Sequence, residues 1–349
     1  MKIVIVGAGV AGLSIGWRLL QAGAQVTILD RGQPGGGATW AAAGMLAVTA
    51  ELEDAVPAER DFAVQSNALW SAFAAEVEQA SGMAIGFARS GSLLLADDAA
   101  GLEAMRERGA ILDTAGVRAL APMLADDLPG GLWVPDEAQV DSRALGEALT
   151  IAFLNAGGSI LPNEAVVTVE HKDGAAVAVL TPYGRYHADA FVIAAGAWSG
   201  QLDIPIVPVK GEVIALSPPA GAVVPGPVIW GNGIYLVPRP DRLLVGATVQ
   251  EAGFDTSLTA QARDSLRARA QRLIPSLRHW SLAEHWAGLR PKTPDGLPLL
   301  GPAHSRNLFI AGGQYRNGIL FAPAIAQTMA DLVLGKGQIN PAFDPRRFS

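Results

Sequence analysis

Short runs of apolar residues alternate with polar turns at the start of the chain. Lys2–Val6 is short, apolar and rich in Ile and Val, which is typical of a strand buried in a parallel sheet. After a glycine-rich turn, residues 11–22 predict a helix that ends at Gly23. Gln25–Leu29 is a second apolar strand, and Asp30 follows it. This pattern predicts a βαβ unit of about 30 residues.

Further elements follow from the same periodicities. Helical spacing of apolar residues predicts helices over 62–78, Ser142–Asn155, Ala260–Leu273 and 323–334. Apolar runs predict strands over 165–169, 191–194 and 308–311, and a hairpin over Ala175–Leu180 and 186–188. Between residues 205 and 286, prolines are dense and β-branched runs alternate with turns, so we expect an antiparallel sheet there.

Strands of the buried, parallel type thus occur at the start, in the middle and near the end of the chain. We therefore predict an α/β protein. It has a Rossmann-type nucleotide-binding domain built from discontinuous segments, and an inserted α+β substrate domain with a mostly antiparallel sheet. The expected boundaries assign 1–82, 136–204 and 286–349 to the nucleotide domain, and 83–135 and 205–285 to the substrate domain.

The turn after the first strand has the spacing G-x-G-x-x-G. Gly7 allows a tight turn, Gly9 lets the backbone approach a pyrophosphate, and Gly12 allows close packing of helix and strand. The helix N-terminus favours an anionic phosphate. Asp30 can accept hydrogen bonds from both ribose hydroxyls, and its charge disfavours a 2′-phosphate. The pattern indicates an adenine dinucleotide but does not separate FAD from NAD; a structural glycine turn and a surface acid are the alternatives.

Composition narrows the class of protein. Half of the 349 residues are hydrophobic and the formal net charge is −7, which argues against a nucleic-acid partner. The chain has no cysteine, so disulfides, a thiol nucleophile and a flavin attached through sulfur are excluded. Its apolar N-terminal stretch ends at Arg18 and is short for a membrane span. A signal peptide competes there, but we expect a cytoplasmic protein without an integral membrane segment.

Four blocks of sequence resemble the D-amino-acid oxidase superfamily of FAD-dependent oxidoreductases, most closely its bacterial glycine oxidase (ThiO) branch. The first is the glycine turn with Asp30. The others are residues 38–45 (ATWAAAGM), 191–198 (FVIAAGAW) and the C-terminal stretch 288–323. The C-terminal stretch contains Gly312-Gly313 followed by Arg316-Asn317-Gly318-Ile319-Leu320. The resemblance therefore covers nearly the whole chain.

The resemblance implies a non-covalently bound FAD and a set of residues that contact it. For the adenine it implies a valine backbone at Val166 or Val167, of which we prefer Val167. Met45 is expected against the flavin ring, with simple core packing as the alternative. The expected cofactor-binding residues are Gly7, Gly9, Val10, Ala11, Gly12, Asp30, Arg31, Thr39, Ala42, Ala43, Gly44, Met45, Val167, Ala195, Gly196, Trp198, Gly313, Arg316, Asn317, Gly318, Ile319 and Leu320.

The resemblance also implies a substrate site. A buried substrate carboxylate needs a paired cation, and arginine provides a permanent charge and two parallel donors. Arg290 is expected in that role, Arg316 as a possible second donor and Tyr235 as a hydrogen-bonding partner. The alternatives are a structural arginine beside Pro291 and a core aromatic residue at Tyr235. Family members often have histidine where this chain has Gln314, so the polarity near the flavin can differ.

The resulting hypothesis is an FAD-dependent amino-acid or amine oxidase. It would oxidise glycine, sarcosine or a small D-amino acid by hydride transfer from the α carbon to flavin N5, with O2 as electron acceptor. The resemblance extends this to a role in thiamine thiazole synthesis. A dehydrogenase that reduces a quinone or carrier, and a flavin- or NAD-binding module without turnover, are the alternatives. No acid–base residue is required, no metal-binding spacing occurs among the histidines, and we expect a homo-oligomer.

Overall fold

The first sheet contains the strands that the sequence predicts as buried and parallel. The computed structural model describes residues 1–52, 55–222, 224 and 226–348. The strand order is β18-β19-β12-β1-β2-β8, and only the edge strand β18 is paired antiparallel. These strands are β1 (Lys2–Val6), β2 (Gln25–Leu29), β8 (Ser159–Leu161), β12 (Ala190–Ile193), β18 (Leu299–Pro302) and β19 (Leu308–Gly312).

Helices cover one face of this sheet, and a small sheet covers the other. The apolar side chains of α1, α4, α7 and α9 form one core with Ile3, Ile5 and Val192. Side chains of β9 and β10 pack with Val4, Val6 and Phe191 on the opposite face. The helices are α1 (Val10–Gln21), α4 (Pro57–Ser81), α7 (Ser142–Asn155) and α9 (Ala322–Val333); the strands are β9 (Thr168–Lys172), β10 (Ala175–Leu180) and β11 (Arg185–Tyr186).

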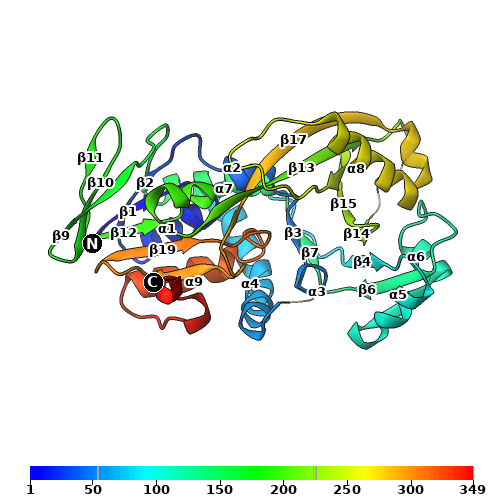
Figure 1. Ribbon diagram of the computed structural model, residues 1–349, viewed down its shortest axis with the longest axis horizontal. Coiled ribbons are helices and arrows are strands. Elements are labelled where there is room, and N and C mark those ends of the chain that lie inside the picture. The colour runs from blue at the N-terminus through cyan, green and yellow to red at the C-terminus, as the bar shows by residue number, and fades with distance from the viewer. Residues whose placement is uncertain (53–54, 223, 225, 349) are drawn as a thin grey trace.

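The second large sheet is mostly antiparallel and has the order β17-β13-β16-β15-β14-β4-β6-β5. Two of its strands, β13 and β17, are long and extend from the first sheet into the second domain (Figure 1). The strands are β4 (Ser92–Leu95), β5 (Ala110–Asp113), β6 (Gly130–Val134), β13 (Val207–Ser217), β14 (Val228–Gly231), β15 (Ile234–Arg239), β16 (Arg242–Gly246) and β17 (Ser281–Lys292). Helix α8 (Ala260–Leu273) packs against its core through Leu266, Ala270 and Leu273.

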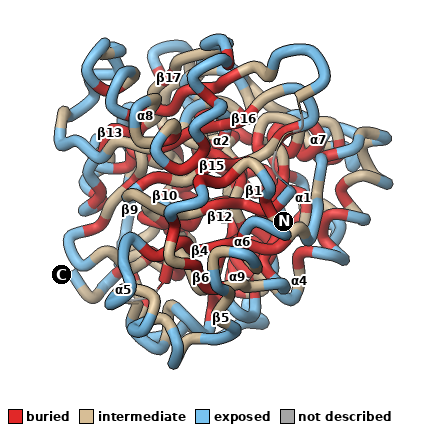
Figure 2. Tube along the Cα trace, turned by 90° about the vertical axis from the view of Figure 1, so that its right-hand side faces the viewer, coloured by how far each residue is buried: buried red, intermediate tan, exposed pale blue. Residues whose placement is uncertain are grey.

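Shorter elements lie between and after these strands and helices. They are α2 (Gly37–Ala41), β3 (Met45–Leu46), α3 (Val48–Glu51), α5 (Ala99–Ala104), α6 (Thr114–Leu120), β7 (Ala138–Gln139) and five 3-10 helices in the described chain, at Arg106–Arg108, Gly196–Leu202, Pro275–His279, Pro341–Phe343 and Pro345–Phe348. Figure 2 shows buried positions concentrated along the strands and exposed positions at the turns around them. Both termini lie beside the mostly parallel sheet (Figure 1).

The fold class is confirmed, and most predicted elements agree with the structure. Helices α7 and α8 have the predicted bounds, and α1 begins one residue earlier than expected. The strand predicted over 165–169 is wrong at its start, because regular pairing begins only at Thr168. Helix α4 is longer than predicted at both ends. Strand β17 crosses the proposed domain boundary between residues 285 and 286, and the boundaries themselves stay a prediction.

Candidate active site

One large cavity lies where the two sheets meet. Its volume is about 390 Å³, which is typical of a small-molecule site. Its walls come from the glycine turn, residues 36–47, residues 164–166 and residues 194–198 on the nucleotide side. On the substrate side they come from β13, β15, β17 and residues 314–319. Segments far apart in sequence therefore share one cavity.

The glycine turn has the geometry that its spacing predicts. Gly7 has a φ of 108°, and a Cβ there would be 2.3 Å from the carbonyl oxygen of Ala194. A Cβ at Gly12 would be 1.9 Å from the carbonyl oxygen of Gly7, so Gly12 serves helix packing and does not line the cavity among the described residues. Gly9 precedes α1 without a capping side chain, and the Thr39 hydroxyl accepts from the Val10 N–H at 2.9 Å. The first turn thus offers backbone N–H groups to an anion.

Asp30 stands at the end of β2 and lines the cavity. Its Oδ2 accepts from the Ala8 N–H at 2.6 Å, and its Oδ1 accepts from the Gly32 N–H at 2.7 Å. Each carboxylate oxygen has a further lone pair, so the ribose hydroxyls remain possible donors. The neighbouring Arg31 guanidinium lies over the Trp198 ring at 4.4 Å from its centroid, and both residues line the cavity.

The segment 41–45 forms the cavity wall between the two domains. Buried Arg239 connects this segment to Val140. Its Nη2 donates to the carbonyl oxygens of Ala43 at 2.6 Å and Val140 at 2.8 Å. Gly44 has a φ of 79°, and a Cβ there would be 1.9 Å from the Val140 oxygen. Position 44 therefore requires glycine, and Met45 lines the cavity next to it.

Three expected cofactor contacts besides Gly12 do not line the cavity in the part of the chain described. Val167 is 56% exposed and its N–H donates to the Leu180 carbonyl, whereas Val166 lines the cavity. The preference for Val167 therefore moves to Val166. Leu320 is buried, and its carbonyl accepts from the side chains of Ser66 and Trp70.

Gly313 is the third of these residues. It has a φ of 73°, and a Cβ there would be 2.4 Å from the Thr293 side chain. Gly313 therefore shapes the turn, while residues 314–319, which follow it, line the cavity. The remaining expected contacts line the cavity: Gly7, Gly9, Val10, Ala11, Asp30, Arg31, Thr39, Ala42, Ala43, Gly44, Met45, Ala195, Gly196, Trp198, Arg316, Asn317, Gly318 and Ile319.

The three expected substrate residues meet at the other end of the same cavity. Arg290 on β17 lies across Gly211 of β13, and its Nη1 donates to the Thr248 carbonyl at 3.2 Å. Tyr235 on β15 lines the wall nearby. Burial raises the pKa of Tyr235 to about 12, although the Arg290 guanidinium opposes this. The phenol therefore stays protonated at neutral pH and can donate a hydrogen bond.

Glu51, which no sequence pattern predicts as a site residue, lies beside Arg316. The Glu51 side chain is 8% exposed, and its Oε2 is 2.6 Å from Arg316 Nη2. Burial raises the pKa of Glu51, while the charges of Arg316 and Arg290 oppose that rise. Arg316 thus has an internal partner and is less available to a substrate than Arg290. No local sequence pattern around Glu51 marks it, because its partner lies 265 residues away.

The residues of this cavity fit FAD. The glycine turn leaves room for backbone N–H groups to meet phosphates, and Asp30 is placed for a ribose. At the opposite wall, the Gln314 Nε2 is buried and has no hydrogen-bond partner among the described residues, so it is available to a polar ring edge. None of the described lining residues is a histidine or cysteine that could attach a flavin covalently.

The described part of the chain contains neither a metal-binding cluster nor a helix suited to span a membrane. No three His, Cys, Asp or Glu side chains in it are grouped so that they could hold a metal ion. In the same residues, none of the helices combines the length and apolar character needed to cross a bilayer.

Comparison with known proteins shows which protein family the chain belongs to. The family described as DAO, FAD dependent oxidoreductase, matches residues 2–332, so the chain belongs to this family. It is thus an FAD-dependent oxidoreductase with a non-covalently bound flavin, as the sequence predicts.

Within this family, the chain is similar to proteins named ThiO/ThiG and glycine oxidase. The bifunctional protein ThiO/ThiG of Synechocystis sp. is 39% identical over 356 residues, which cover 99% of this chain and 54% of that protein. The chain therefore spans about half the length of this relative. The glycine oxidase of Geobacillus kaustophilus is 35% identical over 366 residues, with 99% and 96% covered. The crystal structure of glycine oxidase from that organism has a TM-score of 0.91 at 34% identity, covering 100% of this chain and 98% of that one.

Proposed function

We propose that this chain oxidises a small amino acid, such as glycine, sarcosine or a small D-amino acid, to an imine that water hydrolyses to an oxo acid and ammonia (methylamine from sarcosine). The redox chemistry would be supplied by bound FAD: N5 would accept the hydride from the substrate α carbon, and O2 would accept the electrons and form H2O2. The names of the similar glycine oxidases support the substrate class. Similarity to a ThiO/ThiG protein supports a further proposal, that the product enters thiamine thiazole synthesis.

The position of Arg290 carries this proposal. Its guanidinium lines the cavity, one nitrogen is fixed by the Thr248 carbonyl, and the phenol of Tyr235 lies beside it. A carboxylate entering this partly dry space loses hydration, and a bidentate arginine compensates for that loss. Met45 and Ala43, which we expect at the flavin, line the same cavity as Arg290.

The remaining groups bind and orient and need not transfer a proton. Tyr235 has a pKa of about 12 and is a donor to the carboxylate, unsuited to act as a base near neutral pH. The lone pair of a neutral substrate amine is enough to assist hydride departure. The protein thus supplies position and electric field, which is the usual division of labour in a flavoenzyme.

The test compares Arg290→Ala and Arg290→Lys on glycine and methylamine, which differ by the carboxylate. Arg290→Ala should lower kcat/KM for glycine by about 2–5 kcal/mol in transition-state free energy, with FAD still bound. Arg290→Lys should recover only part of it, because a point charge lacks the paired donors. Anaerobic flavin reduction measures both. Arg278→Ala, on an exposed arginine outside the cavity lining, is the control. Equal losses for both substrates would mean that Arg290 supports the fold or the flavin.

Peroxide formation in air tests the electron acceptor. Stoichiometric H2O2 per oxidised substrate is expected for an oxidase. Anaerobic flavin reduction by glycine with negligible peroxide in air would instead indicate a dehydrogenase that uses a quinone or carrier.

A further inference from the structure

A buried pair of opposite charges lies on β13 outside the cavity wall. Lys210 is 2% exposed and Glu212 is fully buried, and Lys210 Nζ is 3.3 Å from Glu212 Oε1. The residue between them, Gly211, faces the cavity under Arg290. Side chains alternate along a strand, so the two charges point away from the cavity. Desolvating such a pair is costly, so its presence in a strand next to the site calls for a specific use.

The pair ties one segment, residues 247–259, to β13. Lys210 Nζ donates to the Ser257 carbonyl. Glu212 Oε2 accepts from the Thr259 N–H at 2.9 Å, and Oε1 accepts from the Thr259 hydroxyl at 3.0 Å. His285 on β17 completes the group, with Nε2 at 2.9 Å from Glu212 Oε2. Burial alone would raise the pKa of Glu212, but the hydrogen bonds from Thr259 and the bond and charge of Lys210 together lower it.

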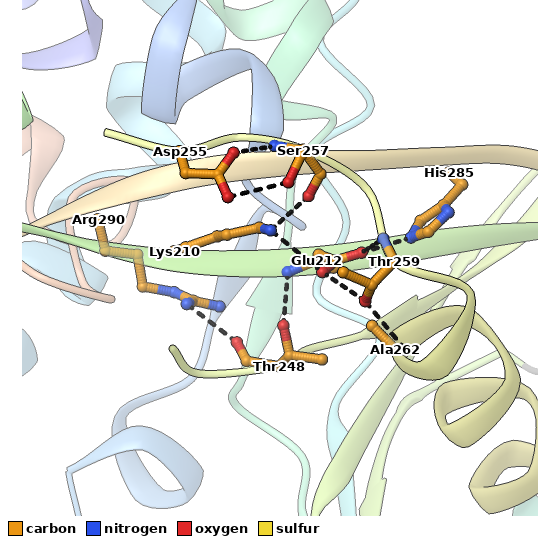
Figure 3. Close-up of polar contacts among 9 residues, drawn as sticks. All are labelled: Lys210, Glu212, Thr248, Asp255, Ser257, Thr259, Ala262, His285 and Arg290. Atoms are coloured by element: carbon orange, nitrogen blue, oxygen red, sulfur yellow. Dashed lines mark hydrogen bonds and ion pairs between the residues drawn. The ribbon is translucent and has the colours of Figure 1, made fainter. Parts of the chain in front are cut away.

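The other end of the same segment reaches Arg290. The backbone N–H of Glu212 donates to the Thr248 hydroxyl at 2.9 Å, and the Thr248 N–H donates to the Glu212 carbonyl at 3.2 Å. The Thr248 carbonyl then accepts from Arg290 Nη1. Figure 3 shows these contacts as a continuous chain from Lys210 through Glu212 and Thr248 to Arg290. The guanidinium is therefore held by a carbonyl whose own position depends on β13.

We propose that Lys210, Glu212 and Thr248 form a positioning unit that fixes Arg290 for the substrate carboxylate by anchoring the segment 247–259. None of the three needs to touch the substrate. The inference rests on the proposed function, because it assumes that Arg290 binds a carboxylate. Lys210 and Glu212 act on the anchor points at Ser257 and Thr259, and Thr248 transmits the position to the guanidinium.

The first experiment measures acetate binding to the FAD-loaded enzyme through the change in flavin absorbance. Arg290→Ala is tested first and should weaken acetate binding strongly. Lys210→Met removes the charge while keeping a long side chain, and should weaken acetate by about tenfold. Lys336→Met, on an exposed lysine, is the matched control and should bind acetate as the unmodified protein does. Thermal unfolding of each variant separates a loss of stability from a loss of affinity.

A double variant distinguishes positioning from an independent effect. If Lys210 acts only through Arg290, adding Lys210→Met to Arg290→Ala should cause no further loss of acetate affinity. A further tenfold loss would overturn the proposal, because Lys210 would then act without Arg290. A Lys210→Met protein that unfolds at lower temperature but binds acetate normally would also overturn it.

Thr248 provides a milder variant in case Lys210→Met does not fold. Thr248→Val keeps the shape but removes the hydroxyl that accepts from Glu212, and should weaken acetate severalfold. Thr248→Ser keeps that hydroxyl and should recover most of the affinity. Equal affinities for the Val and Ser variants would overturn the inference. If Arg290→Ala itself leaves acetate binding unchanged, it is the proposed function of Arg290 that fails.

Discussion

The guanidinium group of Arg290 lies across the backbone of Gly211 on the neighbouring strand. A Cβ atom at Gly211 would be 2.3 Å from Arg290 Nη1 and 2.4 Å from Nη2. Val209 is the residue directly opposite Arg290 in the antiparallel pairing, so the arginine reaches diagonally over the glycine towards Thr248. The absence of a side chain at position 211 is what allows this path.

Gly211→Ala should therefore displace Arg290 without disturbing the fold. Gly211 lies outside the left-handed region of φ, so alanine causes no backbone strain, and only the flexible arginine must move. We expect kcat/KM for glycine to fall by about tenfold or more, because small misplacements of a binding group are costly. FAD content and unfolding temperature should change little. Gly184→Ala is the control, since its Cβ would meet only ordinary contacts. An unchanged kcat/KM would show that the guanidinium position is not critical.

Substitution of Asp30 should have two separate effects, one on FAD binding and one on the stability of the apoprotein. The carboxylate holds the N–H groups of Ala8 and Gly32, and we expect it also to accept from the ribose. Asp30→Asn keeps one acceptor and should lose about 1.5–3 kcal/mol of FAD affinity, since bonds to a charged acceptor are worth that much. Asp30→Ala should in addition destabilise the apoprotein. Titration of apoprotein with FAD and urea unfolding measure the two effects; the idea fails if Asp30→Asn binds FAD normally.

Glu51 should make the stability of the protein depend on pH. Its folded-state pKa lies above its ordinary value of 4.5, mainly because of burial, so the folded state binds a proton more readily than the unfolded state. The contribution of Glu51 to stability therefore falls as pH rises from the ordinary value through the raised one. Glu51→Gln cannot titrate and should lack this component. The free energy of unfolding of both proteins, measured from about pH 4 to 8, gives the comparison.

The difference between the two proteins has a defined sign. The unmodified protein should lose stability relative to Glu51→Gln as pH rises through this window. Loss of the Arg316 partner offsets the two curves by a constant amount, because arginine stays charged throughout. A difference that grows in the opposite direction would mean that the charge of Arg316 outweighs the burial of Glu51.

Local sequence determined the nucleotide side of this protein almost completely. The order of strand, glycine turn, helix and terminal acid within residues 2–30 depends on backbone sterics and hydrophobic periodicity, which act over a few residues. Gly7 and Gly12 stand where a Cβ would strike the backbone, so the chain itself specifies these positions. The bounds of α7 and α8 follow in the same way from their apolar spacing and from Asp141 and Thr259, which cap them.

Tertiary structure alone decided which side chains face the cavity outside regular elements. Val166 and Val167 are adjacent and chemically alike, and only the pairing of Val167 with Leu180 places one at the cavity and the other at the surface. Gly313 and Leu320 lie in the stretch that the sequence predicts to contact the cofactor. However, Gly313 packs against Thr293, and the Leu320 carbonyl accepts from Ser66. Their directions depend on packing partners that are distant in sequence, which no local pattern records.

Local sequence also does not record which charged and polar groups surround Arg290. Glu51 meets Arg316 from 265 residues away, and Thr248 reaches Arg290 from the segment that follows β16. The chain sequence determined that an arginine with the chemistry to bind a carboxylate stands at position 290. Only the sheet, by pairing β13 with both β16 and β17, decided which neighbours fix it and which compensate its charge, because those contacts arise from long-range strand pairing.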